Sequence, residues 1–292
     1  MTDIKYKAKD YRTDLKPVWC PGCGDFGVLG ATHKALAMLQ INPEDIMLLS
    51  GIGCSSRFPG YTNVYGFNSI HGRAVPIATG AKVANPDKTV LVVGGDGDGY
   101  SIGGGHLPHV ARKNVNLTYI VMNNNIYGLT KGQCSPTTPQ GDWTKTTEYG
   151  SIDVPVNPVH YNLAYGASFI ARGYSSNIKH LSNLIKEAIE HPGFAIVDVI
   201  SPCVTFRGDD QFKILKPLMR VIGEDEEYKD HDYTDKTAAY ALAMPQPGGL
   251  IPIGIYYKEL RRTYTDGFKM IQEKAKAKGE GTVEAVFDQF LR

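Results

Sequence analysis

The chain has 292 residues, enough for one large core or for a main domain with a smaller appendage. It is 42% hydrophobic and 21% charged, and its formal net charge is +1, which argues against nucleic acid or an anionic membrane as the main partner. The beginning of the chain is polar and charged and no long apolar run follows, so we expect a cytoplasmic protein that is neither secreted nor membrane-spanning.

Short apolar runs predict buried β-strands, and helical patterns lie between them. The runs are rich in branched residues and bounded by Gly, Asp, Asn or Pro, and they cover residues 45–51, 89–96, 117–124 and 194–200. Helices are expected at about 26–40, 104–114 and 177–191. Alternating strands and helices indicate an α/β fold whose mostly parallel sheet is flanked by helices.

The alternation weakens after residue 203. An acidic stretch at 223–235 and a turn-like stretch at 240–249 precede a charged helix expected at about 257–278. We therefore interpret residues 1–203 as the main domain and residues 204–292 as a C-terminal extension that packs on this domain or on another chain. A solvated surface extension is the alternative.

The stretch WCPGCGDFG, residues 19–27, allows three interpretations: a redox thiol pair, half of a metal site, or a G-x-G-x-x-G nucleotide loop. A nucleotide loop follows a strand, whereas DLKPVWCP precedes these glycines, and the chain has no G-x-x-x-x-G-K-[ST] motif. Both facts argue against a nicotinamide or ATP enzyme. The five cysteines form a poor disulfide framework, but they could supply one four-cysteine site with one left over: Cys20, Cys23, Cys54, Cys134 and Cys203.

A glycine-aspartate loop follows the second predicted strand, in LVVGGDGDGYSIGGGH at residues 91–106. Ligands of parallel sheets bind at this end of the strands, and glycines let the backbone approach a phosphate. A carboxylate such as Asp96 suits that place if Mg²⁺ lies between it and the phosphates. Asn124 stands 28 residues later, just after the next strand, so the two side chains together favour a magnesium-diphosphate site. Taken separately, each motif could be only a turn or a loop cap.

This spacing resembles the thiamine diphosphate fingerprint. Three further stretches, CPGCGDFG, GIGCSSRFPGY and YGLTKGQCSPTTP, make the chain from about residue 17 to 210 resemble the β subunit of the 2-oxoacid:ferredoxin oxidoreductases, most closely the 2-oxoglutarate branch. The resemblance implies a thiamine diphosphate-binding fold. It also implies that thiamine diphosphate, Mg²⁺ and a [4Fe–4S] cluster are the cofactors.

The resemblance assigns roles to residues of the glycine-aspartate loop and its neighbours. It implies that Mg²⁺ is held by Asp96, Asn124 and the carbonyl of Ile126, and that the diphosphate is lined by Gly95, Gly97 and Asp98. Residues expected near the cofactor are Ser55, Ser56 and His71, of which a lone histidine is otherwise more often a satisfied core residue. Arg57 would face the substrate carboxylate, since a guanidinium binds carboxylates through two hydrogen bonds, and Leu129 and Thr130 would lie beside the reacting carbon.

The resemblance also sorts the cysteines. The expected cluster ligands are Cys20, Cys23, Cys54 and Cys203, whereas Cys134 matches no ligand. Spacing alone also permits a structural zinc ion on the same four thiolates. Two places depart from the family pattern: Arg207 stands where relatives usually carry asparagine, and TTEYGSID differs slightly from the usual sequence.

The implied reaction is the reversible oxidative decarboxylation of 2-oxoglutarate with coenzyme A to succinyl-CoA and CO₂, with electrons passing through the cluster to ferredoxin. Pyruvate and a branched-chain oxoacid are the alternative substrates, and a zinc-stabilised binding module is the alternative of a different class. Thiamine activation requires a glutamate from a facing thiamine domain, which this chain lacks. We therefore expect an α subunit to supply it, in an αβ dimer of dimers.

Overall fold

The computed structural model describes residues 5–279 and 281–291. One sheet has the strand order β2-β1-β3-β4-β6-β5-β8-β7. Its strands are β1 (Ile46–Ser50), β2 (Tyr65–Asn68), β3 (Thr89–Gly95), β4 (Leu117–Asn123), β5 (Phe169–Tyr174), β6 (Phe194–Ile200), β7 (Met219–Val221) and β8 (Ile251–Lys258). Every neighbouring pair is parallel except β5 with β8, so the predicted mostly parallel sheet is confirmed.

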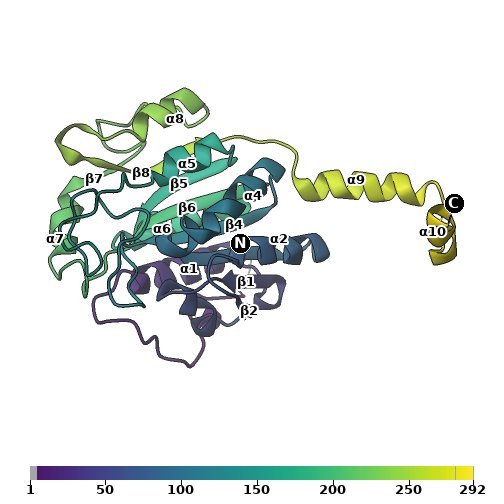
Figure 1. Ribbon diagram of the computed structural model, residues 1–292, viewed down its shortest axis with the longest axis horizontal. Coiled ribbons are helices and arrows are strands. Elements are labelled where there is room, and N and C mark those ends of the chain that lie inside the picture. The colour runs from purple at the N-terminus through teal and green to yellow at the C-terminus, as the bar shows by residue number, and fades with distance from the viewer. Residues whose placement is uncertain (1–4, 280, 292) are drawn as a thin grey trace.

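Helices connect the strands and cover both faces of the sheet (Figure 1). They are α1 (Asp25–Leu39), α2 (Ala74–Ala84), α3 (Asp96–Gly99), α4 (Leu107–Lys113), α5 (Pro158–Ala164), α6 (Ile178–Glu190), α7 (Gln211–Leu215), α8 (Lys236–Leu242), α9 (Tyr264–Lys276) and α10 (Val283–Phe290). No helix within the described residues is both long and apolar enough to cross a membrane.

Two hydrophobic cores sandwich the sheet, because successive strand residues point to opposite faces. In β3, Val90 and Val92 belong to the core shared with α2, α4 and α5, whereas Leu91 and Val93 belong to the core shared with α1 and α6. Burial on both faces explains why β3 and β4 are continuous apolar runs. The carboxyl ends of these strands are therefore held in a rigid frame.

The four predicted strands correspond to β1, β3, β4 and β6, and the three predicted helices correspond to α1, α4 and α6. The sequence pattern missed β5 because a charged side chain interrupts it. Arg172 of β5 lies 3.0 Å from Asp198 of the neighbouring β6, and the two side chains are only 15% and 4% exposed. Pairing across the sheet makes a buried charge tolerable.

The C-terminal part differs from the expectation at one point. Residues up to Lys258 form strand β8, so the helix expected at 257–278 is wrong at its beginning, and α9 begins at Tyr264. Thr263 sets that start: its hydroxyl accepts the Asp266 N–H at 3.1 Å, and the Asp266 carboxylate accepts the Thr263 N–H at 3.3 Å. Helices α9 and α10 extend away from the body around the sheet (Figure 1). The division at residue 203 stays a prediction, although β7 and β8 continue the same sheet.

Candidate active site

A cavity of about 350 Å³ opens at the carboxyl ends of the central strands, and we call it the Asp96 cavity. Its wall brings together most of the predicted cofactor and substrate residues: Ser55, His71, Gly95, Asp96, Gly97, Asp98, Asn124, Ile126, Leu129 and Thr130. Ser56 and Arg57 do not line it. Ser56 is buried and its carbonyl accepts the Ser50 hydroxyl at 2.7 Å, whereas Arg57 is exposed on the wall of an adjoining cavity.

Asp96 is the most deeply placed charged group of this cavity, with only 1% of it exposed. The hydroxyls of Ser135 and Thr137 both donate to its Oδ2 atom, at 2.5 and 2.7 Å, and the Asn124 N–H donates to Oδ1 at 3.4 Å. Burial raises the pKa of Asp96, and these hydrogen bonds oppose the rise because they stabilise the carboxylate. A cation bound beside Oδ1 would offset the remaining free-energy cost of burying the Asp96 carboxylate.

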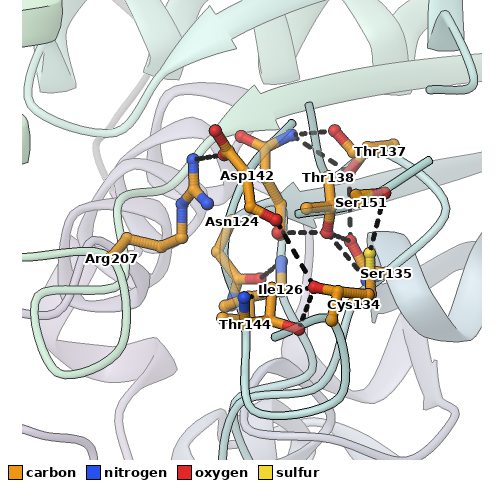
Figure 2. Close-up of polar contacts among 12 residues, drawn as sticks. Asn124, Ile126, Cys134, Ser135, Thr137, Thr138, Asp142, Thr144, Ser151 and Arg207 are labelled. Atoms are coloured by element: carbon orange, nitrogen blue, oxygen red, sulfur yellow. Dashed lines mark hydrogen bonds and ion pairs between the residues drawn. The ribbon is translucent and has the colours of Figure 1, made fainter. Parts of the chain in front are cut away.

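Asn124 and Ile126 form a tight turn next to Asp96. The Asn124 side-chain oxygen accepts the Ile126 N–H at 3.1 Å, which turns the chain just after β4 (Figure 2). Within the described residues the Ile126 carbonyl accepts no hydrogen bond. An amide oxygen, a carboxylate and a free carbonyl are the hard oxygen ligands that Mg²⁺ takes, so the residues present fit this ion.

A tyrosine that the sequence analysis did not single out covers the glycine-aspartate loop. The Tyr127 hydroxyl donates to the Gly97 carbonyl at 3.0 Å, and a Cβ atom on Gly97 would lie only 2.3 Å from Tyr127 Cε1. Residue 97 must therefore be glycine while the ring keeps its place. The ring centroid of His71 lies 6.0 Å from that of Tyr127, so both rings form one side of the cavity.

Asp98 stabilises the glycine-aspartate loop through hydrogen bonds to neighbouring loops. Its Oδ1 atom accepts the N–H groups of Ile52 and Gly72, at 3.0 and 2.7 Å. Burial raises the pKa of Asp98, and these two backbone donors counteract the rise. Asp98 lines the cavity, and its hydrogen bonds also join three loops at the sheet edge; its contact with a diphosphate stays a prediction.

The four predicted cluster ligands meet at a second cavity of about 250 Å³, which we call the cysteine cavity. Its wall includes Cys20, Cys23, Cys54 and Cys203, together with the cations Arg57 and Lys131. Cys134 does not line it; its sulfur lies 3.4 Å from the Ser151 hydroxyl (Figure 2). No group of three or more His, Cys, Asp or Glu side chains in residues 5–279 and 281–291 is arranged to hold a single metal ion.

The two cavities are neighbours that share the wall residues Cys54, Asn124, Gly128 and Leu129. Gly128 keeps this wall thin. A Cβ atom on Gly128 would lie 3.6 Å from Cys54 Sγ and 4.0 Å from Cys203 Sγ, so both sulfurs face the same place. A group held by these sulfurs would therefore lie next to the Asp96 cavity.

Burial raises the pKa of the cysteine thiols: that of Cys54 to about 11, and those of Cys23 and Cys203 above their usual range. For Cys203, hydrogen bonds from the backbone N–H groups of Phe206 and Thr205 oppose the rise. Thiolates in this partly buried place need a positively charged centre bound to them.

The sequence analysis missed four contributors that come from one long loop. Tyr127 and Gln133 line the Asp96 cavity, and Ser135 and Thr137 hold Asp96. All four lie in YGLTKGQCSPTTP, so the family motif was the available signal, although only Leu129 and Thr130 of it received roles.

The chain is similar to several known proteins. Residues 51–199 match the family described as thiamine pyrophosphate enzyme, C-terminal TPP binding domain, and residues 203–273 match the family of the C-terminal part of the pyruvate ferredoxin oxidoreductase beta chain. The chain is 40% identical over 268 residues to 2-oxoacid:ferredoxin oxidoreductase 2, subunit beta, of Aeropyrum pernix, covering 90% of this chain and 87% of that protein. It is 37% identical to 2-oxoglutarate synthase subunit KorB of Methanothermobacter marburgensis, covering 93% of each.

A solved structure is also similar. It is 2-oxoglutarate:ferredoxin oxidoreductase from Magnetococcus marinus with 2-oxoglutarate, coenzyme A and succinyl-CoA bound, and a chain of it is 44% identical with a TM-score of 0.91. The similarity covers 99% of this chain and 97% of that chain.

Proposed function

Because this chain belongs to the β subunits of the 2-oxoacid:ferredoxin oxidoreductases, we propose that it is the thiamine-binding half of an enzyme that oxidatively decarboxylates 2-oxoglutarate, with coenzyme A, to succinyl-CoA and CO₂. One observation carries the proposal. The cavity around Asp96 and the cavity around the four cysteines share a wall, so a decarboxylation site and an electron acceptor would be neighbours.

The Asp96 cavity is proposed to hold thiamine diphosphate and Mg²⁺, a cofactor that serves as the electron sink of decarboxylation when it is bound. Asp96, Asn124 and the Ile126 carbonyl would hold the ion. Gly95 and Gly97 would let the backbone approach the diphosphate, while Ser55 and His71 line the same cavity. Ser135 and Thr137 donate hydrogen bonds that favour the ionised form of Asp96 and orient its carboxylate.

The cysteine cavity is proposed to hold a [4Fe–4S] cluster, which accepts single electrons for transfer to ferredoxin. A structural zinc ion needs its thiolates to converge to about 2.3 Å from one point. A four-iron cluster instead distributes four thiolates over four irons. The four cysteines line one cavity, and the similarity of the chain to 2-oxoacid:ferredoxin oxidoreductase β subunits supports the cluster over zinc.

Two cationic side chains near the Asp96 cavity favour 2-oxoglutarate as the substrate. Arg57 and Lys131 are two cations on the wall of the cysteine cavity, and Leu129 lines both this cavity and the Asp96 cavity. A five-carbon diacid needs more positive charge than pyruvate or a branched-chain oxoacid, because it carries a second carboxylate. We propose that Arg57 binds a substrate carboxylate, and that Leu129 and Thr130 lie beside the reacting carbon.

A partner subunit is required to complete the site. No glutamate is among the described residues that line the Asp96 cavity, although thiamine activation requires one. We propose that an α subunit supplies it from a facing thiamine domain, and that αβ pairs form a cytoplasmic dimer of dimers.

The test is the complex purified with its partner subunit under anaerobic conditions. We expect bound iron, sulfide and thiamine diphosphate, and a kcat/KM for 2-oxoglutarate above those for pyruvate and branched-chain oxoacids. Zinc in place of iron would overturn the electron-transfer function. A higher kcat/KM for pyruvate would overturn only the choice of substrate.

A further inference from the structure

An ion pair joins the loop that carries Cys203 to the loop that lines the Asp96 cavity. Arg207 Nη2 lies 2.6 Å from Asp142 Oδ2, and the side chains are only 18% and 32% exposed (Figure 2). We propose that Arg207 and Asp142 are a positioning pair that fixes Cys203 relative to the thiamine-binding loop. The inference rests on the proposed function, because Cys203 matters here as a cluster ligand.

On the cysteine side, Arg207 belongs to the same turn as Cys203. The Arg207 N–H donates to the Cys203 carbonyl at 3.0 Å. A displacement of Arg207 would therefore move the turn that carries Cys203.

On the thiamine side, a series of contacts connects Asp142 to Ser135. The Ser151 N–H donates to the Asp142 carbonyl at 2.9 Å, and the Ser151 hydroxyl lies 3.4 Å from Cys134 Sγ (Figure 2). The residue after Cys134 is Ser135, whose hydroxyl donates to Asp96. The contacts are thus continuous from the Arg207 guanidinium to Asp96.

The two loops also pack against each other. Phe206 packs on the backbone of Gly132, where a Cβ atom would lie 3.0 Å from Phe206 Cδ1, and the Lys145 ammonium lies 5.7 Å from the Phe206 ring centroid. The ion pair adds an electrostatic attraction between one side chain of each loop.

The pair also predicts how each substitution changes the midpoint potential of the cluster. With both partners present their charges cancel near the cysteine cavity. Arg207→Asn leaves the Asp142 carboxylate without its counter-charge, and Asp142→Asn leaves the Arg207 guanidinium without its counter-charge. Since reduction makes a cluster more negative, a nearby anion lowers its midpoint potential and a nearby cation raises it.

The experiment compares Arg207→Asn, Asp142→Asn, the double variant and Arg207→Lys, each purified anaerobically with the partner subunit. We expect iron loss to a chelator to be faster by about threefold to fivefold in each asparagine variant. The double variant should be no worse than either single one, since the two residues act as a pair. Arg207→Lys should stay near the wild type. The midpoint potential should fall in Arg207→Asn and rise in Asp142→Asn.

Arg220→Asn is the matched control, because it removes another partly exposed ion pair, with Glu227 at 3.2 Å. Arg220→Asn should change neither the rate of iron loss nor the midpoint potential. Unchanged iron loss in the asparagine variants, additive effects in the double variant, or potential shifts of the same sign would overturn the positioning pair while leaving the proposed function intact. A wild-type complex without iron would overturn both.

Discussion

The Thr137 hydroxyl donates to Asp96 Oδ2 at 2.7 Å across 41 residues of sequence, and this bond couples a loop without regular structure to the end of β3. Ser135 donates to the same oxygen at 2.5 Å. The predicted magnesium ligand is thus oriented by two hydroxyls from a loop that also lines both cavities.

Removing one hydroxyl should weaken cofactor binding. Thr137→Val keeps the shape of the side chain but takes a donor from a buried carboxylate, and we expect about tenfold weaker binding of thiamine diphosphate with Mg²⁺. Titration calorimetry on the complex would measure the Kd. Thr118→Val is the control: it loses a buried hydrogen bond of 3.0 Å to the Ala188 carbonyl, away from the cavity. Equal weakening in both variants would contradict the role of Thr137.

Gly97→Ala should also impair cofactor binding, for a steric reason. The new methyl group would lie 2.3 Å from Tyr127 Cε1, so the ring must leave the cavity wall. We expect about tenfold or greater loss of affinity for the cofactor, equivalent to about 1.4 kcal/mol. Gly105→Ala meets nothing within 4 Å and should bind normally. Adding Tyr127→Ala should remove the clash; an affinity that still falls as in Gly97→Ala would show that the clash is not the cause.

The cysteines are expected to separate into two classes. Cys203→Ser should lose most of the bound iron and the electron transfer to ferredoxin, because a serine is a poor replacement for a thiolate ligand. Cys134→Ser should retain iron, since Cys134 lies outside the cysteine cavity. Iron analysis and the electron paramagnetic resonance spectrum of the reduced complex measure the difference. Full iron occupancy in Cys203→Ser would remove it from the ligand set.

Arg57→Ala tests the proposed substrate contact. A bidentate contact to a carboxylate is worth enough for KM to rise about tenfold when it is lost. Thiamine diphosphate should remain bound, because Arg57 does not line the Asp96 cavity. Lys186→Ala, which removes an exposed cation paired with Glu190, should leave KM unchanged. If KM for 2-oxoglutarate is the same in Arg57→Ala, another residue binds the carboxylate.

Stability should fall in mild acid because of His33. Burial, followed by the charge of Arg12, lowers the pKa of His33 to about 4. Between pH 6.5 and 4 the unfolded chain binds a proton that the native chain does not, so the free energy of unfolding decreases as pH falls, by about 3 kcal/mol over the window. His33→Gln should reduce this slope by about 1.4 kcal/mol per pH unit in urea titrations. The same slope as in the wild type would mean that His33 is protonated in the native state.

The contact between Asp96 and Asn124 was predictable from the sequence, and it is present: the Asn124 N–H donates to Asp96 Oδ1 at 3.4 Å. Both residues directly follow apolar runs that pair as parallel strands β3 and β4, which end at the same sheet edge. The site roles of Ser135 and Thr137 were not predictable from periodicity. Residues 124–157 contain no regular helix or strand, so no repeating pattern tells where their side chains point.

The sequence by itself determined the central strands, the end of the sheet that carries the polar residues, and the family, because apolar periodicity and short motifs are local properties of the chain. Only the tertiary structure decided what depends on distant segments meeting. It places Arg172 of β5 against Asp198, makes Gly128 the thin wall between two cavities, and brings Arg207 to Asp142. Buried charges and loop contacts are stabilised by partners that are far away in sequence. These partners meet only in the folded chain, so no local pattern reveals them.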